Sequence, residues 1–201
     1  MINSGIIGPT CIIVAHPDDE SLFFTPIINF LNKENNLYLL CLTNGMFSKH
    51  FFSYNSLLMQ LKCFYTPLII KGNFYGLGKE REKELINSCK LLGIKEDNVK
   101  IVNNELIQDQ PHDKWELSVV ISEIESFIDS NKIETVFTFD EFGVSKHINH
   151  ISVNESILKW LNDSKRSCYP SIYVLLSCNL LIKYSGMLSW IYCFFSNNNE
   201  L

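Results

Sequence analysis

The residues best suited to catalysis follow a short apolar segment near the start of the chain. One imidazole and three carboxylates fall within five positions, at His16, Asp18, Asp19 and Glu20. The segment before them, residues 10–14, is apolar and β-branched, which predicts a buried strand that ends just before this cluster. Pro17 favours a stiff turn with His16 extended. We expect Asp18 and Asp19 to point in opposite directions, so that one can bind a metal while the other faces a substrate.

A second cluster follows another predicted buried strand, residues 134–140. It contains His147 and His150, which are separated by two residues. Ligand sites in open α/β sheets lie beyond the carboxyl ends of the strands, so we expect the two clusters to share one crevice. Two histidines and one carboxylate, with a fourth position open, are typical of a catalytic zinc site.

Each cluster also has a purely structural interpretation. An Asp-Asp-Glu sequence after a strand can be a helix N-cap followed by an acidic first turn. Two histidines three positions apart also occur on solvated helix faces. The pairing of the two clusters favours the metal site over these alternatives.

The elements that must position these residues alternate along the chain. Apolar segments predict strands at residues 10–14, 37–42, 98–103, 134–140 and 171–178. Helical spacing predicts helices at residues 22–31, 79–93 and 114–131 and around 153–161. This alternation predicts a Rossmann-like three-layer α/β fold with a mostly parallel sheet and the active site at the carboxyl ends of its strands.

Composition narrows the class of protein. The 201 residues fit one domain, with 46% hydrophobic residues and a net charge of −5. The absence of a basic stripe argues against a nucleic-acid partner. The seven cysteines show no Cys-x-x-Cys pair and favour a reducing compartment. We see no signal peptide and no stretch of about 20 apolar residues that demands a transmembrane helix.

Two segments do not fit the alternating pattern. Residues 46–72 are rich in Phe, Tyr, Leu and Lys without a clear period, and can be a membrane-contacting insert. We prefer a second hypothesis, a translated intron, because codons for residues 45–47 can contain a splice donor and removal of the segment keeps the frame. Residues 186–201 form an apolar tail, too short to span a membrane, that can lie at a membrane interface or mark an incorrectly predicted gene end.

Three motifs in order resemble the PIG-L/LmbE family of zinc-dependent de-N-acetylases: residues 16–20, 76–85, and 138–140 followed by 147–150. Within it, the chain looks most like the eukaryotic N-acetylglucosaminylphosphatidylinositol de-N-acetylases. The resemblance implies hydrolysis of the N-acetyl group of GlcNAc-phosphatidylinositol (GlcNAc-PI), the second step of GPI-anchor synthesis. It also implies peripheral contact with the cytosolic face of the endoplasmic reticulum.

The resemblance assigns roles to the clustered residues. It makes His16, Asp19 and His150 ligands of Zn²⁺, with another divalent metal as the alternative. Asp18 becomes the general base that takes a proton from the metal-bound water. His147 is then placed to steady the tetrahedral oxyanion or to protonate the leaving amine.

Three further residues have two interpretations each. Arg81 can hold a substrate hydroxyl or phosphate, or form an ion pair with a glutamate on the helix surface. Lys146 stands where the family usually has a small residue, and can narrow the pocket or contact a phosphate. Asp140 can orient a ligand histidine or cap the loop that follows it.

Two other functions compete with this one. Eukaryotic members of the family typically begin with a membrane-spanning helix, and none is visible here. A soluble deacetylase of small GlcNAc conjugates is therefore the first alternative. An inactive, mis-spliced homologue is the second, because of residues 46–72.

Overall fold

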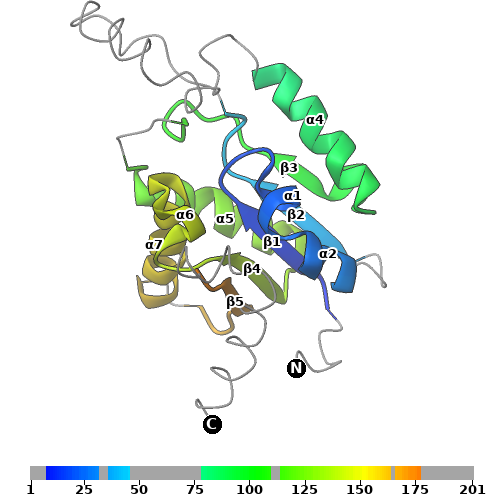
Figure 1. Cartoon of the computed structure of the whole chain (residues 1–201). Coiled ribbons are helices and arrows are strands. Elements are labelled where there is room, and N and C mark those ends of the chain that lie inside the picture. The colour runs from blue at the N-terminus through cyan, green and yellow to red at the C-terminus, as the bar shows by residue number, and fades with distance from the viewer. Residues whose placement is uncertain (1–7, 32–35, 46–77, 110–113, 164–165, 178–201) are drawn as a thin grey trace, which may run out of the picture.

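A parallel sheet forms the centre of the computed structural model, which describes residues 8–31, 36–45, 78–109, 114–163 and 166–177 (Figure 1). Its strands are β1 (Thr10–Val14), β2 (Leu37–Cys41), β3 (Val99–Ile101), β4 (Thr135–Phe139) and β5 (Ser171–Leu175). Their order in the sheet is β3-β2-β1-β4-β5, and every pair of neighbours is parallel. The predicted parallel α/β sheet is thereby confirmed.

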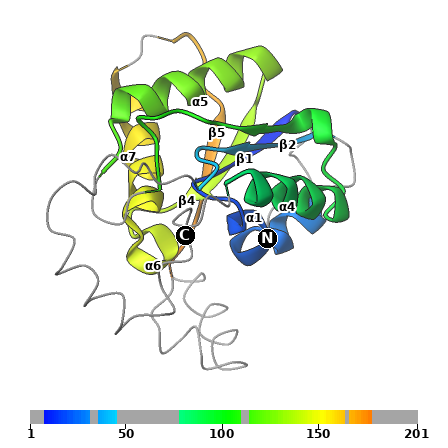
Figure 2. The same cartoon turned by 90° about the horizontal axis from the view of Figure 1, so that it is seen from above.

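Helices cover both faces of this sheet. They are α1 (Asp19–Phe23), α2 (Thr25–Leu31), α4 (Gly78–Leu91), α5 (Leu117–Asn131), α6 (Gly143–Lys146) and α7 (Ile148–Asp163). Figure 2 shows α5 and α7 on one side of the sheet and α1, α2 and α4 on the other. This arrangement confirms the three-layer fold. The usual right-handed crossover accounts for it, because the chain moves one way along the sheet from β1 to β3 and the opposite way from β3 to β5.

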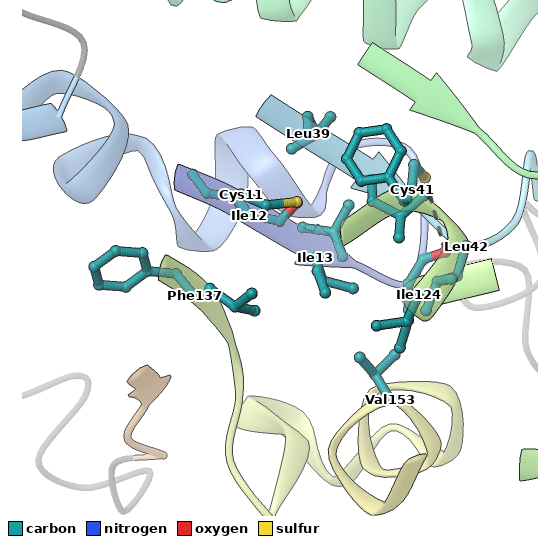
Figure 3. Packing of buried hydrophobic residues seen from close by; sticks show 14 of the residues in the cluster. Cys11, Ile12, Ile13, Leu39, Cys41, Leu42, Ile124, Phe137 and Val153 are labelled. Atoms are coloured by element: carbon teal, nitrogen blue, oxygen red, sulfur yellow. Dashed lines mark hydrogen bonds between the residues drawn. The ribbon is translucent and has the colours of Figure 1, made fainter. Parts of the chain in front are cut away.

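The core is continuous across these layers. All five residues of β1 are buried, as expected for a parallel strand covered on both faces. Figure 3 shows Ile12 and Ile13 of β1 packed among side chains of β2, β4, α5 and α7, including Ile124 and Val153. Each such side chain stabilises the fold by about 1.5–3 kcal/mol when fully buried. The two strands that lead into the candidate site, β1 and β4, are thus buried along their whole length.

Several element boundaries differ from the predictions. The single helix predicted over residues 22–31 is two helices, α1 and α2, divided at Phe24. Pro26 explains the division, because it has no N–H to continue the hydrogen bonds of α1. The helix predicted from residue 114 begins at Leu117, and the strand predicted over 98–103 is only Val99–Ile101, after a 3₁₀ turn at Glu96–Asn98.

The sheet has a topological switch between β1 and β4. From β1 the chain moves to β2 and β3 on one side, whereas β4 and β5 lie on the other. The carboxyl ends of β1 and β4 therefore border a crevice of the kind that binds ligands in open α/β sheets.

Some predictions fall outside the described residues, or touch them only in part. The insert or intron at 46–72 and the tail at 186–201 lie wholly outside them. Within the described residues, helices are too short or too polar to cross a membrane. Cys11, Cys41 and Cys89 are free and buried, as expected for cysteines that act as small core residues.

Candidate active site

The turn after β1 separates the two aspartates. Asp19 opens α1, is only 3% exposed, and turns back toward the strand end. Its Oδ2 accepts hydrogen bonds from the backbone N–H groups of Ala15 (3.1 Å) and His16 (2.8 Å). Asp19 therefore closes the turn and holds its carboxylate inside the molecule.

Asp18 points the other way. It occupies the N-cap position of α1 with φ 97° and ψ −22°, yet its side chain accepts no capping hydrogen bond. The expected divergence of the two carboxylates is present, but a left-handed residue produces it and not the extended chain that the sequence predicted. The Asp18 side chain is 60% exposed. Desolvation by the surrounding protein, together with the negative charge of Asp19, raises the pKa of Asp18 to about 6.

The second cluster is held by the loop after β4. The carboxylate of Asp140 accepts hydrogen bonds from the backbone N–H of Phe142 and from the N–H and hydroxyl of Ser177. Asp140 thus caps the loop, the second of its two interpretations. A backbone group orients the histidine instead: Nδ1 of His150 lies 3.0 Å from the carbonyl oxygen of Gly143. The His150 ring also stacks on Phe139, with centroids 4.0 Å apart.

Hydrogen bonds to the backbone distinguish the two histidines of this cluster. A carbonyl oxygen can only accept, so Nδ1 of His150 carries the hydrogen and Nε2 has a free lone pair. That Nε2 is buried, makes no hydrogen bond of good geometry, and lies 3.2 Å from Oδ1 of Asp19. His147 is reversed, because its Nδ1 accepts the backbone N–H of Asn149 at 3.3 Å and its hydrogen is therefore on Nε2.

His16 connects the two clusters. Its Nδ1 lies 3.6 Å from Oδ2 of Asp19, and its Nε2 lies 3.3 Å from Oδ1 of Asp109 and 2.9 Å from Nδ2 of Asn149. Burial lowers the pKa of His16, but the hydrogen bonds and charges of Asp109 and Asp19 outweigh burial and raise it to about 9.

These residues fit a metal ion. Ligand atoms of His16, His147 and His150 lie within 4.8 Å of one another, and Asp19 contacts the rings of His16 and His150. The Nε2 of His150 is buried without a hydrogen bond, and a metal ion bound there would satisfy its lone pair. Because Nδ1 of His147 accepts a backbone N–H, its Nε2 carries a hydrogen and is a poorer metal ligand than Nε2 of His150. Burial, together with the neighbouring His16 and His150 rings, lowers the pKa of His147 to about 4, so its ring is neutral.

Arg81 reaches this site from α4. Its Nη2 donates to the carbonyl oxygen of Pro17 at 3.0 Å and lies 3.5 Å from Oδ2 of Asp18, and its Nη1 lies 3.6 Å from Oδ2 of Asp109. Arg81 therefore points into the site and not toward a glutamate on its own helix. Gly45, at φ 75°, allows this approach, because a Cβ there would lie 2.2 Å from Nη1.

Lys146 has a different position. It lies at the end of α6 with an exposed side chain and φ 61°. Its backbone N–H donates to the carbonyl oxygen of Phe142. The role predicted for Lys146 in substrate binding stays a prediction.

The sequence as a whole matches one known family. The PIG-L family, described as GlcNAc-PI de-N-acetylase, matches residues 11–161, a span that holds every residue of the site. The chain belongs to the PIG-L family.

Individual relatives agree with this membership. The chain is 33% identical to an N-acetylglucosaminyl-phosphatidylinositol de-N-acetylase of Bos taurus, over 89% of this chain and 60% of that protein. It is also 33% identical to a probable enzyme of the same name from Schizosaccharomyces pombe, over 89% of this chain and 61% of that one. The chain thus spans about 60% of the length of these relatives.

A solved structure supports the fold. The N,N'-diacetylchitobiose deacetylase of Pyrococcus horikoshii superposes with a TM-score of 0.55 at 17% identity, over 79% of this chain and 51% of that chain. At this identity the likeness concerns the fold alone, and it is consistent with the parallel sheet of the PIG-L chain.

Two residues of the PIG-L site were not predicted from the sequence. Asp109 follows β3 in a stretch to which the sequence analysis assigned no role, yet it contacts both His16 and Arg81. Asn149 lies between the two histidines, and its carboxamide is fully buried against His16. The sequence feature that could have pointed to Asn149 is its position between His147 and His150. For Asp109 the sequence offered only its acidic side chain.

Proposed function

We propose that this PIG-L chain hydrolyses the acetamide of GlcNAc-PI, releasing acetate and glucosaminyl-phosphatidylinositol, with Zn²⁺ held by His16, Asp19 and His150. The observation that carries the proposal is the Nε2 of His150, which makes no hydrogen bond and lies beside Asp19, with the exposed carboxylate of Asp18 on the same turn. Zinc bound there would supply a Lewis acid for the amide carbonyl and for the attacking water.

The chain's own residues supply the proton transfers. Asp18 has the exposure and the raised pKa of a general base that works near neutral pH, so it accepts the proton of the attacking water. The hydrogen on Nε2 of His147 can be donated to the carbonyl oxygen as negative charge develops on it. Of the two roles considered for His147, the neutral ring favours stabilisation of the oxyanion.

Substrate recognition is assigned to Arg81, with Lys146 as a further candidate. The guanidinium of Arg81 is only 17% exposed and is held by Pro17 and Asp109, so it is already oriented for a hydroxyl or phosphate oxygen. The names of the relatives support GlcNAc-PI as the substrate. As the family resemblance implies for an enzyme of this lipid substrate, we also propose action at the cytosolic face of the endoplasmic reticulum, with peripheral membrane contact.

The experiment that tests this function measures acetate release from GlcNAc-PI and from water-soluble GlcNAc conjugates. We expect activity on the lipid that a chelator removes and added zinc restores. Asp18→Ala should lose most of that turnover. Equal activity on the soluble conjugates would favour the soluble deacetylase, and full turnover by Asp18→Ala would contradict the proposed mechanism.

Residues 46–72 are proposed to be translated intron. A transcript that always retains their codons would overturn this proposal. Equal activity of the full chain and of a chain without these residues would show that the segment does not impair the site.

A further inference from the structure

The helix that starts at Asp19 is capped in an unusual way. An aspartate at the N-cap ordinarily uses its own carboxylate to accept an N–H of the first turn. Asp18 does not, and Oε2 of Glu20 instead accepts the N–H of Asp18 itself at 3.0 Å. The carboxylate of Asp18 is thus not used as a cap, and it lies on the exposed side of the turn beside Arg81.

Glu20 is itself fixed by a second helix. Its other oxygen, Oε1, accepts a hydrogen bond of 2.6 Å from the hydroxyl of Ser88 on α4. The Glu20 residue is only 1% exposed, and burial raises the pKa of its carboxyl group. A buried carboxylate of this kind is a costly choice for packing alone, since an apolar side chain fills such a position more favourably.

One face of α4 forms hydrogen bonds to both ends of the turn at residues 17–20. Arg81, Leu85 and Ser88 are spaced four and three residues apart, which places them on one side of the helix. Arg81 donates to the carbonyl oxygen of Pro17, and Ser88 donates to Glu20. A pocket of about 170 Å³ remains between the turn and α4, so these polar contacts set their relative position.

Asp18 needs such support because its backbone is strained. A φ of 97° is unusual for any residue with a Cβ, and it persists only where the surroundings enforce it. The N–H of Asp18 is the group that the Glu20 carboxylate holds. Without this bond, Asp18 can relax to an ordinary N-cap, with its carboxylate turned toward the backbone of α1.

We propose that Glu20, anchored by Ser88 of α4, is a positioning residue that holds Asp18 in its left-handed conformation and keeps its carboxylate turned away from the backbone of α1, where it can act as the base. This inference rests on the proposed deacetylase function. It assigns a role in the reaction to a residue of the first cluster for which the sequence suggested none.

Three variants of the full, zinc-loaded chain test the proposal. Glu20→Ala removes the acceptor, and we expect kcat to fall by about 10–100-fold with KM and zinc content unchanged, because a small displacement of a catalytic group has effects of this size. Glu20→Gln should stay within about threefold of the wild type, since its amide oxygen accepts the Asp18 N–H and its NH₂ group can donate to Ser88. Ser88→Ala should lower kcat by about three- to tenfold.

A control and a double variant separate positioning from general damage. Glu125 also accepts hydrogen bonds across elements, but its partners, Trp160 and Arg166, are not residues of the site, so Glu125→Ala should leave kcat unchanged. In an Asp18→Ala background, Glu20→Ala should cause no further loss, because it acts through Asp18. A full additional loss would overturn the proposal.

Hydrogen exchange of the Asp18 amide provides a readout that needs no turnover. Its protection should disappear in Glu20→Ala, weaken in Ser88→Ala and persist in Glu20→Gln. If the wild type releases no acetate but the amide behaves in this way, the proposed function fails and the positioning stands. The positioning is wrong if kcat of Glu20→Ala stays within twofold of the wild type, or if Glu20→Gln falls as far. Should Glu20→Ala not fold, an unchanged kcat and unchanged amide protection in Ser88→Ala would overturn it.

Discussion

Asp19 has two roles, one in the stability of the turn and one beside His150, and a pair of substitutions can separate them. Its Oδ2 accepts the N–H groups of Ala15 and His16, while its Oδ1 faces Nε2 of His150. Asp19→Ala removes both functions. Asp19→Asn keeps an oxygen for the two backbone groups but places an NH₂ group against His150, where it donates to the lone pair that a metal would use.

The structure sets the size of the expected effects. Both N–H groups belong to buried residues, and each buried donor left without a partner costs about 1–3 kcal/mol. The free energy of unfolding of the zinc-free Asp19→Ala protein should therefore be lower than that of the wild type by about 2–6 kcal/mol. Zinc-free Asp19→Asn should recover most of this loss, although it should bind zinc as poorly as Asp19→Ala.

Urea unfolding of the chelator-treated proteins measures the first effect, and metal analysis after dialysis against zinc measures the second. Asp163→Ala is the matched control, because Asp163 is exposed at the end of α7 and should change stability by less than about 0.5 kcal/mol. Equal stability of the alanine and asparagine variants of Asp19 would refute the dual role. So would wild-type zinc binding by Asp19→Asn.

Three more predictions concern the residues around the site. Gly143→Ala should reduce zinc affinity and activity together, because Gly143 has φ 58° and a Cβ there would lie 2.8 Å from Cβ of His150. Zinc titration checks this prediction, and an unchanged zinc affinity would contradict it. Ser177→Ala should lower the free energy of unfolding by about 1–3 kcal/mol, because the buried Asp140 carboxylate loses a hydrogen bond. A urea midpoint equal to that of the wild type would contradict this prediction. Arg81→Lys should lower kcat/KM by about tenfold or more, since an ammonium group cannot reproduce its fork of contacts; kinetics near wild type would show that the fork is unimportant.

The sequence predicted the parts of the site that follow directly from strand ends. His16 comes after β1 and His150 comes after β4, and parallel neighbouring strands bring such positions together whatever the details of the loops. The stacking of His150 on Phe139 and its bond to Gly143 refine this arrangement without changing it.

The sequence could not predict contacts that depend on the path of a loop. Asp109 meets His16 and Arg81 only because the chain after β3 returns over the strand ends, and no local pattern encodes that path. The left-handed conformation of Asp18 was hidden for a related reason. Local preference disfavours a positive φ at an aspartate. The conformation of Asp18 is accompanied by a hydrogen bond from its N–H to Glu20, and Glu20 is bonded in turn to Ser88, which is distant in the sequence.

Zinc binding and acetate release in the same samples test the central claim most directly. Chelator-treated protein should release no acetate from GlcNAc-PI, and activity should return in proportion to bound zinc up to about one ion per chain, the capacity of one three-ligand site. His150→Ala should neither bind that ion nor recover. Full acetate release by the metal-free chain, or by His150→Ala without bound zinc, would contradict the account.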